Sequence, residues 1–197
     1  MADLAAALAA IDAANAADPT LEGGRPAALL YGERMSAELE RLFPEADDVL
    51  RIAARGQHVE RWLLPRKDYP EGKVGYFAWR REQARRHAER VAGIMAAAGY
   101  EAEAQERVGV LLRKEGIKRD AQVQALEDVI CFVFVRHYFA GFAAAQPDHD
   151  MVDIVAKTAR KMSAEARARM LAEFALPEAL AQAIRSAEWG GAAPAAP

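Results

Sequence analysis

The chain has 197 residues, a formal net charge of −3 and one cysteine. These numbers exclude an intramolecular disulfide, and they do not indicate attraction of the whole molecule to nucleic acid or to membrane. The first residues lack the basic start of a signal peptide, and no run reaches the roughly eighteen apolar residues of a membrane span, so we expect a cytoplasmic protein.

Alanine and helical apolar spacing dominate the chain, and no period-2 pattern is long enough to build a sheet. We therefore predict an all-α fold: a single helical domain over residues 1–188 with about seven to nine helices. The tail, residues 189–197, lacks core-forming residues and is expected to be disordered. The predicted helices, in chain order, cover about 3–17, 26–44, 48–65, 76–98, 102–113, 121–144 and 151–162, with one helix starting after Ser163 and a last one near Pro177.

Several boundary residues support these assignments. Asp47 or Asp48, Asp120 and Ser163 suit N-caps, because their side chains accept hydrogen bonds from free helix N–H groups. Gly99 suits a C-cap. The helix over 121–144 contains the run VICFVFV and is expected to be the central buried helix of the fold.

The segment from Arg55 to Val91 has the opposite charge to the rest of the chain. Residues 51–90 hold eleven Lys or Arg against five Asp or Glu, whereas the remainder holds fifteen against twenty-four. Guanidinium groups suit phosphate or carboxylate oxygens because they bind both oxygens at once. We therefore expect this segment to line a concave site for a phosphorylated or other anionic small molecule.

The cations expected to hold that anion come from several predicted elements, and aromatic side chains lie beside them. The expected substrate-binding residues in and near this segment are Arg55, Arg61, Trp62, Arg66, Lys67, Arg80 and Lys114. Tyr76 and Trp79 can extend a stacking surface with Trp62. For the arginines of 80–86, a solvated helix face paired with Glu82 and Glu89 is the alternative.

Three further polar residues stand on apolar helix stripes. His58, His87 and Asp128 lie on three predicted helices, and a polar group in such a place is costly unless it is satisfied. Together they form a possible site for a divalent metal of unknown identity with nitrogen and oxygen ligands. Alternatively, His87 is a satisfied core histidine, and Asp128 pairs with an arginine or caps a helix.

Four long motifs carry a resemblance that covers about residues 8–187. They are GRPAALLYGERM, AARGQHVERWLLPRKDYPEGKVGYFAWR, LLRKEGIKRDAQVQALEDV and KTARKMS. The chain resembles a bacterial and fungal family of unknown function, which brings no established activity. The usual nucleotide, zinc and hydrolase motifs, such as GxxxxGK[ST], GxGxxG and HExxH, do not occur.

More distantly, the order of helices and polar residues is similar to a degenerate HD-domain metal phosphohydrolase. That resemblance places Tyr31 at the first histidine, with Arg34 three residues on as a further substrate-binding residue. It places His58 at the histidine of the His-Asp pair and Val59 at the aspartate. His87 then resembles an additional histidine, and Asp128 the closing acid.

Three functions follow as hypotheses. The first is an HD-like, metal-dependent phosphohydrolase acting on a phosphorylated small molecule or nucleotide, with Glu115 or Glu127 completing the catalytic shell. The alternative is a non-catalytic nucleotide- or anion-binding or regulatory protein that keeps the HD-like pocket. RNA binding through the basic segment has the least support, because the net charge is negative and no RNA module is visible.

Overall fold

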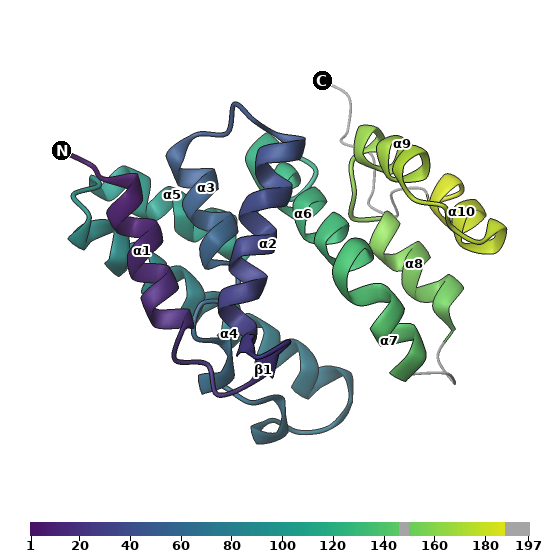
Figure 1. Ribbon diagram of the computed structural model, residues 1–197, viewed down its shortest axis with the longest axis horizontal. Coiled ribbons are helices and arrows are strands. Elements are labelled where there is room, and N and C mark those ends of the chain that lie inside the picture. Colours follow the sequence, from purple (N-terminus) through teal and green to yellow (C-terminus); the bar gives the residue numbers. More distant parts are fainter. Residues whose placement is uncertain (146–149, 188–197) are drawn as a thin grey trace. The chain divides into compact units, whose positions relative to one another are not determined.

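The computed structural model of the protein describes residues 1–145 and 150–187. These residues confirm the all-α prediction and form ten α-helices, where about seven to nine were expected (Figure 1). The strands among them are β1 (Leu21–Glu22) and β2 (Arg25–Pro26), which pair as a small antiparallel hairpin.

The chain forms two compact units, the first over residues 1–116 and the second from Ile117 onwards, and each is described by itself. The single domain expected over residues 1–188 stays a prediction. The tail 189–197, for which disorder was expected, lies outside the described residues.

The first unit contains five α-helices and two 3-10 turns. They are α1 (Leu4–Asn15), α2 (Ala27–Leu42), α3 (Asp48–Gly56), η1 (Arg61–Leu63), η2 (Arg66–Asp68), α4 (Gly72–Ala97) and α5 (Ala102–Arg113). The long helix α4 packs along α5, and α2 packs against α3. Fully buried apolar side chains from these helices form the core: Ile11, Met35, Leu39, Ile52, Val91, Met95 and Leu111.

Helix α3 ends much earlier than the apolar spacing predicts. It stops at Gly56 rather than near residue 65, and the chain continues through left-handed Glu60 into η1 and η2. A Cβ at Gly56 would lie 2.6 Å from the side chain of Val91, so glycine allows α3 to approach α4 closely there. Helix α4 in turn begins at Gly72, earlier than the predicted start at residue 76.

The second unit begins with one long helical stretch. This stretch comprises α6 (Ala121–Val133), the π-helical turn η3 (Phe134–Tyr138) and α7 (Phe139–Ala145), so the helix predicted over 121–144 is present (Figure 1). Three further helices follow: α8 (Met151–Ala159), α9 (Ala164–Glu173) and α10 (Glu178–Arg185).

By length and composition alone, the stretch Ala121–Ala145 could cross a membrane, whereas the sequence analysis expected no run long enough to do so. Its polar side chains are bound within the second unit, however. Asp128 accepts a hydrogen bond from the Ser163 backbone N–H at 2.8 Å, and Arg136 pairs with Glu173 at 3.1 Å. Cys131 is buried in the same stretch. The expectation of a central buried helix over 121–144 holds for α6, where most residues are buried, but not for η3 and α7, which contain no buried residue.

The predicted helix caps are confirmed. Asp47 accepts a hydrogen bond from the N–H of Leu50, and the side chains of Asp120 and Ser163 cap α6 and α9 in the same way. Gly99 follows α4 with φ +82°, the left-handed conformation that lets a glycine end a helix.

Candidate functional site

The basic loop between α3 and α4 is fastened to α4 by side-chain hydrogen bonds. The amide nitrogen of Gln83 donates to the backbone carbonyls of Arg61 at 2.9 Å and Leu64 at 3.0 Å. The indole N–H of Trp79 donates to the same Leu64 carbonyl at 2.9 Å. Gln83 is buried, so these bonds are shielded from water and hold η1 against the helix.

A strained residue fixes the point where this loop turns. Glu60 has φ +51° and ψ +29°, a left-handed conformation that costs a non-glycine residue about 1–3 kcal/mol. Its backbone N–H donates to Oδ1 of the buried Asn15 at 3.1 Å, and its carboxylate pairs with Arg90 at 3.1 Å. Contacts from α1 and α4 therefore hold the turn that presents Arg61.

The next part of the loop lies directly on the first turn of α4. A Cβ at Gly75 would lie 1.9 Å from the carbonyl oxygen of Pro70, a distance no side chain can occupy. Glycine at this position is what allows residues 65–70 to pack against the helix.

The loop, α2 and α4 together form a basic–aromatic cluster, the term used below for Tyr31, His58, Arg61, Tyr76, Trp79 and Arg80. The ring of Tyr31 stacks on His58, with centroids 4.0 Å apart and planes 15° apart. The guanidinium of Arg61 lies 4.6 Å from the centre of the Trp79 ring. Arg80 donates a hydrogen bond to the Tyr76 hydroxyl at 3.2 Å.

Arg61 is a half-buried cation whose guanidinium lies against an aromatic ring. Among the described residues no carboxylate forms an ion pair with it; its side-chain contact is the Trp79 ring. Burial is the largest influence on its pKa and lowers it, and nearby Arg80 lowers it further, while Tyr31 and Tyr76 act in the opposite direction. A desolvated guanidinium beside a second cation is poised to gain from an anion.

Both histidines of the segment are neutral at pH 7. Burial lowers the pKa of His58 well below 6.5, and Arg61, His87, Lys114 and Arg80 lower it further. Burial also lowers the pKa of His87 to about 3, with Arg61 and Arg86 adding to the effect and a hydrogen bond to the Gln57 backbone opposing it. The two imidazole centroids lie 6.1 Å apart.

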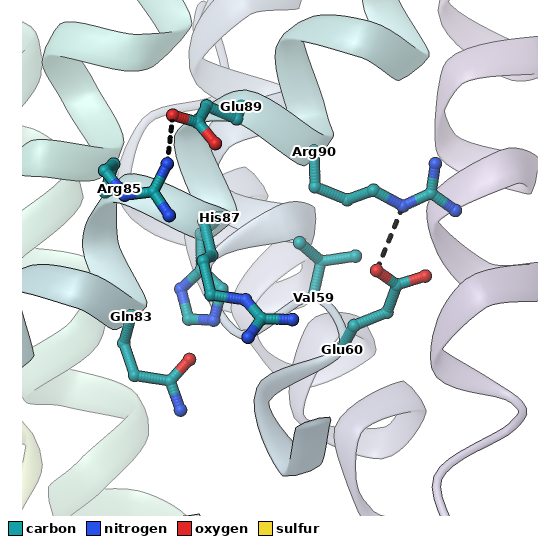
Figure 2. Close-up of a pocket in the computed structure, with 8 residues that line it drawn as sticks. Val59, Glu60, Gln83, Arg85, His87, Glu89 and Arg90 are labelled. Atoms are coloured by element: carbon teal, nitrogen blue, oxygen red, sulfur yellow. Dashed lines mark hydrogen bonds and ion pairs between the residues drawn. The ribbon is translucent and has the colours of Figure 1, made fainter. Parts of the chain in front are cut away.

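His87 also faces a pocket of about 380 Å³, shown in Figure 2. Two of its arginines are neutralised, because Arg85 pairs with Glu89 at 2.6 Å and Arg90 pairs with Glu60. The pocket is lined by Val59, Glu60, Gln83, Arg85, Arg86, His87, Glu89 and Arg90. Neither Arg61 nor His58 lines it, so this pocket and the basic–aromatic cluster meet at His87 and Gln83 but are separate features.

The donor groups do not fit the divalent metal that the HD resemblance implies. In the first unit two imidazoles are neighbours, but Arg61, Arg80 and Lys114 all act on His58, and such cations repel a metal ion. In the part of the chain that the structure describes, no group of three or more His, Cys, Asp or Glu side chains could hold a metal. The meeting of His58 and His87 with Asp128 spans both units and stays a prediction.

Asp128 and the two predicted catalytic acids are all engaged by groups of their own unit. Asp128 is buried in α6, where Oδ1 accepts from the Ser163 N–H at 2.8 Å and from Gln124 at 2.9 Å. It therefore caps α9, and burial raises its pKa despite these bonds. Glu127, also buried in α6, lies 3.9 Å from Lys161, whereas exposed Glu115 pairs with Arg113 at 2.7 Å in the first unit.

Two of the remaining predicted binding residues form ion pairs within the first unit. Arg55 binds both carboxylate oxygens of Asp12 at 2.6 Å and joins α3 to α1, and Arg34 pairs with Glu22 at 2.6 Å. These two arginines have structural partners.

The others lie in or beside the loop. Arg66 donates to the Tyr69 carbonyl at 2.9 Å, which closes η2. Lys67 is exposed on η2, and Trp62 is half-buried in η1. The aromatic ring that contacts the guanidinium of Arg61 is that of Trp79. Lys114 follows α5 in a left-handed conformation, close enough to His58 to affect its pKa.

Sequence reasoning missed Gln83 and Asn15. Gln83 is a polar residue on the buried side of α4, and the same feature, a polar side chain among buried positions of a helix, identified His87 in the sequence. Asn15 sits at the C-terminal end of α1, and no local pattern connects it with Glu60, forty-five residues away.

These features define an all-α protein whose first unit presents a half-buried cluster of unpaired cations and aromatic rings. The chain belongs to the family described as "Domain of unknown function (DUF4202)", whose model matches residues 5–184. No curated protein and no solved structure was found to match the chain.

Proposed function

We propose that the basic–aromatic cluster binds a small phosphorylated anion, without turnover of its own, as a binding or regulatory site. One observation carries this proposal: Arg61 is half-buried with its pKa lowered by burial, and no described carboxylate compensates its charge. A partly desolvated charge without a partner is costly, and an anion that binds between Arg61 and Arg80 removes that cost.

The cluster is also held in place before any ligand arrives. Trp79 fixes the plane of the Arg61 guanidinium, and Gln83 fixes the backbone of Arg61 itself. A fixed guanidinium loses less conformational entropy on binding than a free one, which favours affinity. Neutral His58 offers the ligand a donor on one ring nitrogen and an acceptor on the other.

Calorimetric titration of the protein with inorganic phosphate and with a phosphomonoester tests the proposal. Arg61→Ala should weaken binding by about 1.5–3 kcal/mol, the range for a hydrogen bond to a charged group. Arg81→Ala is the matched control, because Arg81 is exposed on α4 and also lacks a carboxylate partner among the described residues. Equal losses in both variants would mean that only the general positive potential matters, and the proposal would fail.

The metal-dependent phosphohydrolase is kept as a second candidate because of His87. Its Nε2 is buried and has no hydrogen-bond partner among the residues that the structure describes, and such an imidazole nitrogen is a possible metal ligand. The HD-like arrangement gains support from residues that the resemblance assigns to neighbouring site positions: Tyr31 stacks on His58, and the His58 and His87 centroids lie 6.1 Å apart.

Metal content separates the two candidates. We expect the purified protein to hold no stoichiometric transition metal, and its phosphate affinity to survive chelator treatment. About one metal ion per chain, lost in both His58→Ala and His87→Ala, would favour the hydrolase. A cytoplasmic location belongs to either candidate, and the single buried cysteine is consistent with it.

A further inference from the structure

The first three turns of α4 carry a second unusual surface, called here the α4 stripe: Lys73, Tyr76, Phe77, Arg80 and Arg81. The spacing of three and four residues places all five on one side of the helix, and all five are exposed. Phe77 is 58% exposed and Tyr76 39%, and Val74 beside them is 86% exposed. Large apolar side chains gathered this way on a surface usually mark an interaction site.

No carboxylate of the described residues neutralises the cations of the stripe. Within residues 1–145 and 150–187, Lys73, Arg80 and Arg81 form no ion pair with a carboxylate. Further along the same helix, Arg85 is neutralised by both Glu82 and Glu89. The local positive charge is therefore a property of the stripe rather than of the whole helix.

The overall charge of −3 does not cancel this local potential. At physiological ionic strength charges are screened over about 8 Å, so a ligand on the stripe responds mainly to nearby groups. Residues 66–81 hold five Lys or Arg against two acids, Asp68 and Glu71. The stripe therefore attracts anions even though the protein as a whole is weakly acidic.

Rings and cations alternate along this one face. Tyr76 and Phe77 stand between Lys73 on one side and Arg80 and Arg81 on the other, and the two rings contact edge to face with centroids 5.6 Å apart. Trp79 continues the row, 6.1 Å from Tyr76. Such a row is longer than one nucleobase, since its end cations, Lys73 and Arg81, are about 12 Å apart along the axis at 1.5 Å rise per residue.

We propose that the α4 stripe binds single-stranded nucleic acid, with bases on the aromatic rings and phosphates on the cations. Base stacking on aromatic side chains is tolerant of sequence, and a cationic surface follows the backbone. A membrane surface is the other anionic partner to consider. It favours a helix whose cations and apolar groups lie on separate faces, whereas here they share one face.

Fluorescence anisotropy with a labelled oligouridine and a duplex of equal length tests the proposal on the full chain. Phe77→Leu keeps the apolar volume but removes the ring, and should weaken oligouridine binding about 5- to 150-fold. Phe77→Trp should retain binding. Arg81→Gln should also weaken it, while Arg160→Gln, an equal charge change at an exposed and unpaired arginine of the second unit, should not.

Two further measurements are the salt dependence of oligouridine binding and co-sedimentation with lipid vesicles. With three phosphate contacts the affinity should fall about 20-fold between 50 and 200 mM salt. Absence of binding, a preference for the duplex, or no effect of Phe77→Leu would overturn the proposal. The proposal would also be overturned if the protein co-sedimented with anionic phosphatidylserine vesicles and the Phe77→Leu variant did so equally well. Phe77 lies outside the basic–aromatic cluster, so Phe77→Leu should leave the affinity for inorganic phosphate intact, and failure here can be told apart from failure of the small-anion site.

Discussion

At the scale of single residues, burial sets the protonation of the polar groups that were singled out. It is the largest influence on the pKa of His58, His87 and Asp128, and in each case it favours the neutral form. The histidines are therefore uncharged near pH 7. The guanidinium of Arg61 keeps its proton despite burial, so its positive charge persists and a bound anion can compensate it.

The depressed pKa of His87 predicts a specific loss of stability in acid. Its pKa is about 3 in the folded chain and near 6.5 in the unfolded chain, so the unfolded state binds more protons between these values. The stabilisation is full above pH 6.5 and decreases as the pH falls. From pH 7 to 5.5 the contribution of His87 should decrease by about 1 kcal/mol.

His87→Gln removes this titration. The difference in unfolding free energy between the parent and this variant, measured by urea unfolding, should shrink by that amount between pH 7 and 5.5. A difference that stays constant over this range would show that His87 is protonated equally in both states.

At the scale of elements, α4 organises the first unit. It supplies Gln83 and Trp79 to hold the basic loop, Tyr76 and Arg80 to the cluster, and the exposed stripe at its start. Its later turns contribute the buried side chains of Val91 and Met95 to the core. One helix thus links the stability of the unit to the position of Arg61.

Gln83→Ala should therefore weaken both stability and anion binding. It removes the Gln83 donor from the carbonyls of Arg61 and Leu64, of which Leu64 keeps the indole N–H of Trp79. We expect this loss to cost about 1–3 kcal/mol and to loosen the loop that carries Arg61. Gln105→Ala is the matched control, because Gln105 donates one bond to the Tyr100 carbonyl elsewhere in the unit. Thermal unfolding should show lower stability for both variants, whereas phosphate titration should show weaker binding only for Gln83→Ala. Full phosphate affinity in Gln83→Ala would show that the loop keeps its place without this bond.

Two glycines of α4 predict opposite effects of the same substitution. Gly75→Ala places a methyl group against the Pro70 carbonyl and should destabilise by about 1–3 kcal/mol by displacing the loop. Gly93→Ala meets no atom within 4 Å on an exposed helix position and should stabilise by about 0.5–1 kcal/mol. Chemical unfolding of both variants checks the signs. A neutral Gly75→Ala would mean that the loop is not packed on the helix in solution.

At the scale of the whole molecule, the chain has two compact units, each with its own buried apolar side chains. Ile52, Met95 and Leu111 belong to the first unit, and Phe132 and Met170 to the second. We expect residues 1–116 produced alone to unfold cooperatively and to bind phosphate as the full chain does. Circular dichroism during heating and calorimetric titration measure the two properties. An unfolded fragment would instead support the single domain expected from the sequence.

Local signals in the sequence were sufficient for the helices and most of their ends. Asp47, Asp120 and Ser163 cap the helices they were expected to cap, since a cap acts on N–H groups two or three residues away. The excess of positive charge in residues 51–90 could likewise be counted directly.

Only the tertiary structure decided which of those charges are available. In the sequence, Arg55 and Arg61 are equal candidates for anion binding. In the structure, Asp12, forty-three residues earlier, neutralises Arg55, whereas the guanidinium of Arg61 contacts the Trp79 ring. The early end of α3 has the same origin, because the loop carbonyls bind Gln83 and Trp79 rather than continuing a helix. Such partners are distant in sequence, and helical periodicity carries no information about them.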